Sequence, residues 1–232
     1  DHRDLHSFPT RRSSDLLDTK NLGASVAEAL LERAPQSLGE LQPFNGAGIY
    51  ALYYVGEAPI YAPIAEANLG GQWRWPIYVG KAVPSGARKA MSTGATGRWL
   101  FNRLREHAES VQAAENLRVE DFYCRYLVVE DIWIPLGESL LIAKFTPVWN
   151  RMLDGFGNHD PGSGRYNGLR PRWDVLHPGR SWAEKCRERP EPAELIASEI
   201  EAHLRTAPRP PQHPRILLEV PENPIIDSGE DE

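Results

Sequence analysis

The sequence has 232 residues, of which 41% are hydrophobic and 25% are charged, a composition typical of one main globular domain. It contains 20 prolines and 19 glycines, which predict many turns and little continuous helix. No apolar run approaches the length of a membrane-spanning helix. Cys124 and Cys186 are the only cysteines, so neither a disulfide framework nor a structural zinc site is indicated. We therefore expect a cytoplasmic protein with no membrane partner.

The charge of the chain is unevenly distributed. The formal net charge at pH 7 is −6, but segment 219–232 alone carries six acidic residues and no basic one. Segment 77–105 carries six basic residues and no acidic one, and segment 161–189 carries seven basic residues against three acidic ones. Basic stretches of this kind favour a nucleic-acid-binding surface, despite the acidic total.

The first residues are set apart from the rest of the chain. Segment 6–16 resembles the conceptual translation of a common sequencing adapter, so we exclude residues 1–16 from the fold prediction and expect them to be disordered. Apolar residues recur at helical spacing from Leu22 onwards, and Pro35 ends the pattern. Residues 17–42 are predicted to form an N-terminal helical arm, which packs either on its own domain or on a partner.

Two short segments rich in β-branched and aromatic residues indicate a pair of strands. Residues 48–56 (GIYALYYVG) and 76–81 (PIYVGK) are each bounded by Gly or Pro. Alternation along the first segment puts Tyr50 on one face and Ile49 on the other, with phenols and aliphatic side chains on both. We predict that the two strands form a hairpin.

The segment that joins these strands is too long for a simple hairpin turn. Residues 57–75 include several prolines and glycines and two tryptophans, Trp73 and Trp75. Two interpretations remain open. The insertion either has a functional, partner-facing role or forms a lid whose tryptophans fill the edge of the core.

The next element is a helix that carries basic side chains. Leu100 and Leu104 are one helical turn apart, in a pattern that predicts a helix over residues 98–107 with its apolar stripe facing the core. Arg103 and His107 are i and i+4 on this helix, so they project from neighbouring positions on one face.

The rest of the chain completes the predicted elements. Residues 120–129 alternate as a strand, and residues 136–145 form a helix with Glu138 in its first turn. Loop-rich sequence follows. Within it, residues 193–204 have helical composition, and residues 206–232 form a Pro-rich linker that ends in the acidic tail.

Hydrolysis of a phosphodiester needs a positioned water, a proton acceptor, a cation at the developing charge and a clamp on the phosphate. Tyr50 and Tyr78 can hold and deprotonate water if neighbouring groups lower a phenol pKa that is normally about 10. His107 can relay the proton, and Arg103 can neutralise the phosphate with its planar fork. Glu138 supplies a hard oxygen ligand for Mg²⁺, whose other ligands are usually water and phosphate.

The words GIY at 48–50 and YVG at 78–80, with the Arg–His pair and the helix-borne Glu, resemble the GIY-YIG nuclease family. The resemblance implies an α/β (α+β) fold in which helices flank a small three-stranded antiparallel sheet. It places the nuclease core at residues 43–160 and a DNA-contacting, loop-rich extension at residues 161–205. The catalytic residues that it implies are Tyr50, Tyr78, Arg103, His107, Glu138 and Asn150, with Glu138 as metal ligand and Asn150 as an orienting group.

A narrower resemblance rests on later segments. The phrases PVWN at 147–150 and GFGNHD at 155–160, with the segment 173–183, look like the GIY-YIG type II restriction endonucleases that cleave CCGCGG. This resemblance covers about residues 24–187. It implies a homodimer that uses Mg²⁺ to cut double-stranded DNA, and a cognate DNA methyltransferase in the host.

A guanine-rich target is best recognised by basic side chains in the major groove. The candidate DNA-binding residues are Lys81, Arg105, Arg165, Arg170, Arg172 and Arg180. Two other functions remain open. One is a homing or repair nuclease of the same family, and the other is a catalytically inactive DNA-binding module. Taken singly, each candidate catalytic residue also has a structural explanation, because strand tyrosines often pack in cores and first-turn glutamates suit the helix dipole.

Overall fold

The computed structural model describes residues 19–84, 97–207 and 209–210. Residues 1–16, which were predicted to be disordered, and the whole acidic tail 219–232 lie outside these ranges. The strands are β1 (Gln36–Ser37), β2 (Gly48–Tyr54), β3 (Pro76–Ala82) and β4 (Phe122–Val128). The helices are α1 (Thr19–Leu31), α2 (Ala62–Asn68), α3 (Trp99–Ala113), α4 (Ile134–Phe145), α5 (Val148–Arg151), α6 (Arg172–Leu176) and α7 (Ala193–Thr206). Short 3-10 helices include η3 (Pro59–Tyr61), which leads into α2.

The strands form one antiparallel sheet with the order β1-β4-β2-β3. Its three long strands are those predicted from the sequence, and the two-residue β1 adds a fourth that the sequence did not suggest. The two motif strands pair directly, with Tyr50 opposite Gly80 and Leu52 opposite Tyr78. The GIY strand is therefore central, and the YVG strand lies at an edge of the sheet.

Every residue of β2 is buried, because helices cover both faces of the sheet. Tyr50 and Leu52 pack in one core cluster, with side chains from α3 and the C-terminal segments. Ile49 and Ala51 pack in a second cluster, with side chains from α1 and α4. The alternation predicted for this strand is confirmed, and it explains why both faces carry large apolar or aromatic side chains.

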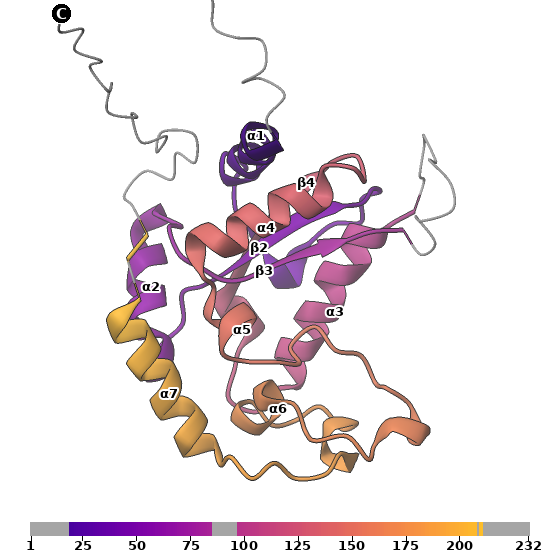
Figure 1. The fold of residues 1–232 in the computed structure, drawn as a ribbon, viewed down its shortest axis with the longest axis vertical. Coiled ribbons are helices and arrows are strands. Elements are labelled where there is room, and N and C mark those ends of the chain that lie inside the picture. Colours follow the sequence, from indigo (N-terminus) through magenta and orange to yellow (C-terminus); the bar gives the residue numbers. More distant parts are fainter. Residues whose placement is uncertain (1–18, 85–96, 208, 211–232) are drawn as a thin grey trace, which may run out of the picture.

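The N-terminal helix packs on its own domain. Ala27 and Leu30 of α1 are fully buried in the same cluster as Leu141 of α4. Figure 1 shows α1 lying beside α4 on one side of the sheet. The sequence left open whether this helix packs on its own domain or on a partner, and the contact with α4 shows that it packs on its own domain.

The insertion between the motif strands is built into the core. Tyr61, Ile64 and Trp75 are almost completely buried, whereas Trp73 is only partly buried. Asn68 joins the two ends of the insertion, because its amide nitrogen donates to the carbonyls of Tyr54 and Trp75. The interpretation as a packed lid therefore holds for Trp75.

The C-terminal extension packs on the same domain. Trp173 of α6 and Ile196, Ile200 and Leu204 of α7 are buried in the core cluster that contains Tyr50. Figure 1 shows one end of α7 close to the insertion, where α7 contacts η3. Across the described part of the chain, no helix combines the length and apolarity needed to cross a bilayer.

Candidate active site

A short hydrogen bond between β2 and α3 lies at the centre of the site. The hydroxyl of Tyr50 is 2.6 Å from Nε2 of His107, and both side chains are buried. The glycine of the YVG word makes room for this pair, because a Cβ at Gly80 would lie only 2.4 Å from the Tyr50 hydroxyl. A larger residue at position 80 would therefore displace the phenol.

Tyr78 lies beside this pair and is closer to solvent. Its ring centroid is 5.3 Å from that of His107 and 6.2 Å from that of Tyr50. Tyr78 is partly exposed on the edge strand, whereas Tyr50 has no exposed surface. Of the two phenols, Tyr78 is the one that incoming water can reach.

The pKa values of both phenols are raised, whereas the role predicted from the sequence required neighbouring groups to lower them. Burial raises the pKa of Tyr50 well above its ordinary value, the charge of Tyr78 raises it further, and the guanidinium of Arg103 lowers it only partly. Burial also raises the pKa of Tyr78, against the lowering effects of Arg103 and of a hydrogen bond with Tyr50. Neighbouring groups thus do not lower the phenol pKa in the free protein, and both tyrosines are neutral at pH 7.

His107 is a neutral imidazole in this environment. Burial lowers its pKa well below the ordinary value, and the positive charge of Arg103 lowers it further. Phe156 stacks on the imidazole, with ring centroids 4.5 Å apart and planes inclined by 12°. Because a phenol is the stronger acid and an imidazole nitrogen the stronger base, Tyr50 donates its proton toward Nε2 of His107.

Arg103 is held in place by the loop that follows α5. Its Nη2 donates to the carbonyl of Gly157 at 2.7 Å, and its Nη1 is 2.9 Å from Nε2 of His159. Nη1 also donates to Glu106 at 3.2 Å. A Cβ at Gly157 would lie 2.5 Å from Nη2, so glycine allows the loop to approach the guanidinium this closely.

Glu138 of α4 forms an ion pair with Lys81 of β3, at 2.6 Å between Oε2 and Nζ. The negative charge of Glu138 is among the causes that raise the pKa of Tyr50 and of Tyr78, which places this carboxylate within electrostatic range of both phenols. Lys81, predicted to bind DNA, therefore has an internal partner.

The carboxylate of Glu138 fits a magnesium ion whose remaining ligands are water or phosphate oxygens. No group of three or more His, Cys, Asp or Glu side chains within the described ranges could hold a metal by itself. Mg²⁺ usually binds through one or two carboxylates and keeps several waters or substrate phosphates. Glu138 alone can fill that role, in competition with Lys81.

Asn150 of α5 acts on the backbone of the edge strand. Its Oδ1 accepts from the N–H of Val79 at 2.8 Å, and its Nδ2 donates to the carbonyl of Val79 at 2.8 Å. An amide side chain thus satisfies both polar groups of the residue next to Tyr78. This geometry suits the orienting role that the resemblance gives to Asn150.

The predicted DNA-binding arginines fall into two groups. Arg170, Arg172 and Arg180 are engaged inside the protein: Arg170 donates to two backbone carbonyls, Arg172 pairs with Glu199, and Arg180 is buried. Their positions argue against direct contact with bases. Arg105 and Arg165 are exposed, and Arg105 forms only a surface ion pair of 3.4 Å with Glu109.

The loop after α5, which includes residues 155–160, contributes contacts to the site that were not predicted from the sequence. Gly157 and His159 contact Arg103, and Phe156 contacts His107, across more than 45 positions of the chain. The phrase GFGNHD carried the family resemblance, but no local pattern indicates that this loop returns to α3. The glycines and polar residues of segment 155–160 are typical of a functional loop, and this composition was the signal that the sequence offered.

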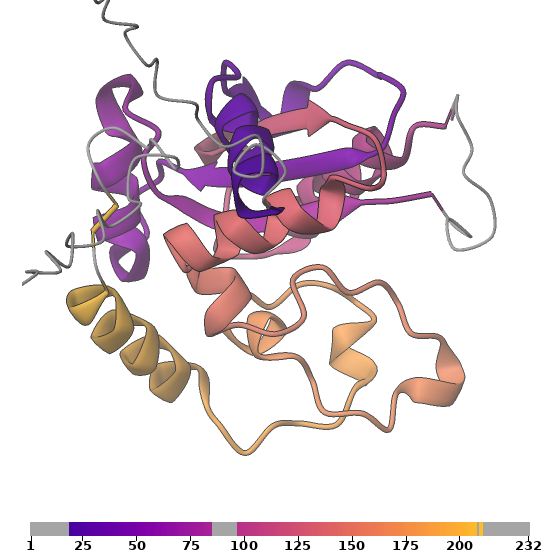
Figure 2. The same ribbon diagram turned by 45° about the horizontal axis from the view of Figure 1, so that its top comes forward.

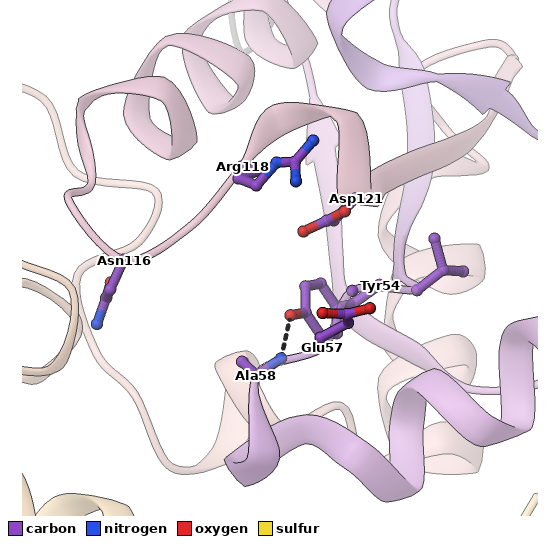
Figure 3. Close-up of a pocket in the computed structure, with 8 residues that line it drawn as sticks. Tyr54, Glu57, Ala58, Asn116, Arg118 and Asp121 are labelled. Carbon is purple, nitrogen blue, oxygen red and sulfur yellow. Dashed lines mark hydrogen bonds between the residues drawn. The ribbon is translucent and has the colours of Figure 1, made fainter.

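A separate pocket of about 340 Å³ lies between segment 54–58, which begins at the last residue of β2, and the residues that precede β4. Figure 3 shows Tyr54, Glu57 and Ala58 from the first segment and Asn116, Arg118 and Asp121 from the second. Burial raises the pKa of the Asp121 carboxyl. None of the six predicted catalytic residues lines this pocket, and its two carboxylates do not suit a phosphate backbone.

Comparison with known proteins agrees with this site. No curated protein matches the chain. The family model described as the Eco29kI GIY-YIG domain matches residues 42–204, which include all six predicted catalytic residues and more than half of the chain. That family is one of DNA-cutting restriction enzymes, in accord with the α+β fold and with the clustering of Tyr50, Tyr78, Arg103 and His107. The chain belongs to the Eco29kI family of GIY-YIG nucleases.

Proposed function

We propose that this protein is a type II restriction endonuclease that hydrolyses double-stranded DNA at CCGCGG in a Mg²⁺-dependent reaction. The observation that carries the proposal is the buried hydrogen bond of 2.6 Å between Tyr50 and His107, next to Tyr78 and Arg103. A second buried Tyr–His pair among the described residues, Tyr61 and His177 at 2.7 Å, has no such combination of neighbours. The adjacent Tyr78 and Arg103 are therefore what favour proton transfer at the Tyr50–His107 pair. Family membership supports nuclease action on DNA.

The attacking water approaches Tyr78, the partly exposed phenol. As its oxygen bonds to phosphorus, its proton passes to Tyr78, the Tyr78 proton passes to Tyr50, and the Tyr50 proton passes to Nε2 of His107. Such a concerted relay needs no free phenolate, so it tolerates the raised pKa of both tyrosines. The phosphorus–oxygen bond on the opposite side breaks, and solvent protonates the leaving oxygen.

Arg103 serves as the phosphate clamp. Its guanidinium is partly exposed and is fixed by Gly157 and Glu106, so little conformational entropy is lost when it binds a phosphate oxygen. Preorganised positive charge at the developing negative charge is usually the largest contribution to a reaction of this type.

Glu138 is the residue that would hold the metal. Bound magnesium supplies Lewis-acid polarisation of the phosphate and of the leaving oxygen. In the free protein the Glu138 carboxylate is held by Lys81, so a cation already occupies the position next to it.

The specificity and the assembly rest on the resemblance to enzymes that cleave CCGCGG. A palindromic site is cut most simply by a two-fold dimer with one site per chain, so we propose a homodimer on DNA. A host that carries such an enzyme needs a DNA methyltransferase of the same specificity to protect its own chromosome. We place both activities in the cytoplasm.

The test is digestion of a plasmid that carries one CCGCGG site, followed by sequencing of the ends. Cleavage at that site with Mg²⁺, and none with EDTA, is the expected result, and light scattering of the complex should give two chains per duplex. Binding without cleavage would favour an inactive DNA-binding module. Cleavage elsewhere would favour a homing or repair nuclease, and a mass of one chain per duplex would contradict the dimer.

A further inference from the structure

The segment 173–183 contains a group of residues that the proposed chemistry does not use. It carries two tryptophans, an aspartate and an arginine, and it was part of the sequence resemblance. In the structure these side chains surround one guanidinium, that of Arg180, which is only 5% exposed. Such complete burial of an arginine requires that all its polar groups be satisfied.

Arg180 uses each of its nitrogens. Nε donates to Oδ1 of Asp174 and Nη2 to Oδ2 of Asp174, each at 2.6 Å, which gives a bidentate ion pair. The rings of Trp173 and Trp182 flank the guanidinium, with centroids 4.5 Å and 4.7 Å from its central carbon. These groups fix the plane and the charge of the side chain.

The remaining donors of Arg180 all point to one loop. Nη2 donates to the carbonyl of Gly155 at 2.9 Å, and Nη1 donates to the carbonyls of Phe156 at 3.1 Å and Asn158 at 3.2 Å. These carbonyls belong to a turn outside any helix or strand, so the loop has no ladder of its own to hold its shape.

The same loop contacts two groups of the active site. Phe156 stacks on His107 at 4.5 Å, and the Gly157 carbonyl accepts from Arg103 at 2.7 Å. The loop therefore lies between Arg180 on one side and the proposed proton acceptor and phosphate clamp on the other. A displacement of the loop would move both groups together.

We propose that Arg180 is a positioning residue that sets the geometry of His107 and Arg103 through the loop 155–158. The proposal rests on the proposed nuclease function for its effect on rate, but its structural part does not depend on that function. Lysine cannot replace arginine here, because a compact ammonium cannot present a planar fork to a carboxylate and three carbonyls at once.

The test compares Arg180→Lys with the matched control Arg170→Lys. Arg170 lies three positions before that segment and also donates to backbone carbonyls, those of Ala183 and Glu184, but not to the loop 155–158. Both proteins are labelled at histidine nitrogen for NMR, and thermal unfolding confirms that they are folded. Single-turnover cleavage and metal-free DNA binding are then measured on a CCGCGG duplex.

Arg180→Lys should shift the His107 resonances, because the ring current of Phe156 changes when the stack is disturbed. Its single-turnover rate should fall by about 100-fold, the order expected from a small misplacement of reacting groups, while DNA affinity stays near wild type. Arg170→Lys should change neither the His107 resonances nor the rate. A folded Arg180→Lys protein with wild-type His107 resonances would overturn the proposal, whatever its rate.

A milder variant covers the case in which Arg180→Lys does not fold. Trp182→Leu removes one of the two rings that flank the guanidinium and leaves the ion pair with Asp174 intact. It should shift the His107 resonances in the same direction by a smaller amount, and unchanged resonances would reject the proposal. If the wild-type protein cuts no DNA, the proposed function fails, whereas the NMR comparison still decides the role of Arg180.

Discussion

Lys81 and Glu138 form an ion pair of 2.6 Å between the edge strand β3 and helix α4. The lysine side chain is 41% exposed and the glutamate side chain 17% exposed, so the pair lies at the rim of the site. A pair of this exposure contributes at most about 1 kcal/mol to stability. For the proposed metal role the consequence is a competition, because a metal that bound Glu138 would have to displace the lysine.

Replacement of Glu138 by glutamine tests the role of the carboxylate. The amide keeps the size and polarity of the side chain but loses the charge that Mg²⁺ requires. We expect the cleavage rate to fall by at least about 100-fold, the order of loss typical when one charge-stabilising group is removed. DNA binding without metal should persist or tighten slightly, since a negative charge near phosphates is removed.

Glu109→Gln is the matched control for that variant. Glu109 forms an exposed ion pair with Arg105 on α3 and has no contact with the predicted catalytic residues. Its cleavage rate should equal that of the wild type in a gel-based time course. A Glu138→Gln protein that cut the CCGCGG duplex at the wild-type rate would show that this carboxylate is not a metal ligand.

Replacement of Lys81 by methionine should free the carboxylate of Glu138. Because the ammonium no longer occupies one of its oxygens, the affinity of the DNA-free protein for Mg²⁺ should rise, by about fivefold if the pair is worth about 1 kcal/mol. Isothermal titration with MgCl₂ measures this change. The double variant with Glu138→Gln should lose the gain, and an unchanged affinity in the single variant would contradict the competition.

The two tyrosines should not be equivalent. Tyr78→Phe removes the hydroxyl that solvent can reach, whereas Tyr50→Phe removes the buried hydroxyl that contacts His107. We expect both variants to lose cleavage in single-turnover assays. Only Tyr50→Phe should also destabilise the fold, by about 1–3 kcal/mol in urea unfolding, because it leaves Nε2 of His107 buried without its partner.

A difference in activity between the two variants would contradict the proposed order of proton transfer. If Tyr50→Phe kept the wild-type rate while Tyr78→Phe lost it, His107 would not receive the proton. Tyr54→Phe provides a comparison outside the site, since its hydroxyl accepts only from the backbone N–H of Ala58 at 2.9 Å. That variant should cut at the wild-type rate.

The central elements of this fold follow from short-range patterns. Period-two alternation in the GIY strand places Tyr50 and Ile49 in different core clusters, as predicted. Arg103 and His107 are four residues apart on α3. Residues at this spacing are neighbours on the surface of any α-helix, so their proximity follows from the sequence. Local patterns therefore indicated four of the side chains that meet in the site, namely both tyrosines, the arginine and the histidine.

The partners of the arginines could not be predicted in this way. Arg180 and Arg165 both lie in a basic, loop-rich segment, yet one is buried and the other is exposed. What separates them is contact with Asp174 and with a loop some 25 residues away, which no periodicity encodes. Charge counts predict a basic surface only when the charges remain unpaired, and here several are satisfied internally.

This division among the arginines predicts different effects on DNA binding. Among the described residues, no side chain pairs with the guanidinium of Arg165, so this residue is free to contact a phosphate. Arg165→Ala should weaken DNA binding and reduce the slope of log affinity against log salt concentration by about 0.9. Fluorescence anisotropy over a range of NaCl concentrations measures both quantities.

Arg172→Ala should behave in the opposite way. Arg172 pairs with Glu199 and lies 3.9 Å from Glu191, so it links α6 to α7 and the segment before it. Its loss should lower the free energy of unfolding by about 1–3 kcal/mol and leave the salt slope of DNA binding unchanged. A wild-type salt slope for Arg165→Ala, or a reduced one for Arg172→Ala, would contradict the assignment.

The buried His177 should make stability depend on pH. Its Nε2 is 2.7 Å from the hydroxyl of Tyr61, its Nδ1 is 2.9 Å from Oδ1 of Asn116, and burial lowers its pKa from 6.5 to about 3. Between these two pH values the unfolded chain binds a proton that the folded chain does not. The stabilising contribution is therefore fully present above pH 6.5 and is lost progressively as the pH falls toward 3.

We expect urea unfolding between pH 4.5 and 6 to give a free energy of unfolding that decreases as the pH is lowered, by up to about 1.4 kcal/mol per pH unit from His177 alone. His107, whose pKa burial also lowers, should add to the slope in the same direction. His177→Gln should reduce the slope by the contribution of one titrating group.

Tyr61→Phe is the control, because it removes a hydrogen bond of the same network but no histidine, so it should lower stability equally at each pH. If His177→Gln and the wild type gave the same slope, protonation of His177 would not be coupled to unfolding, and the loss of stability in acid would have to come from other groups.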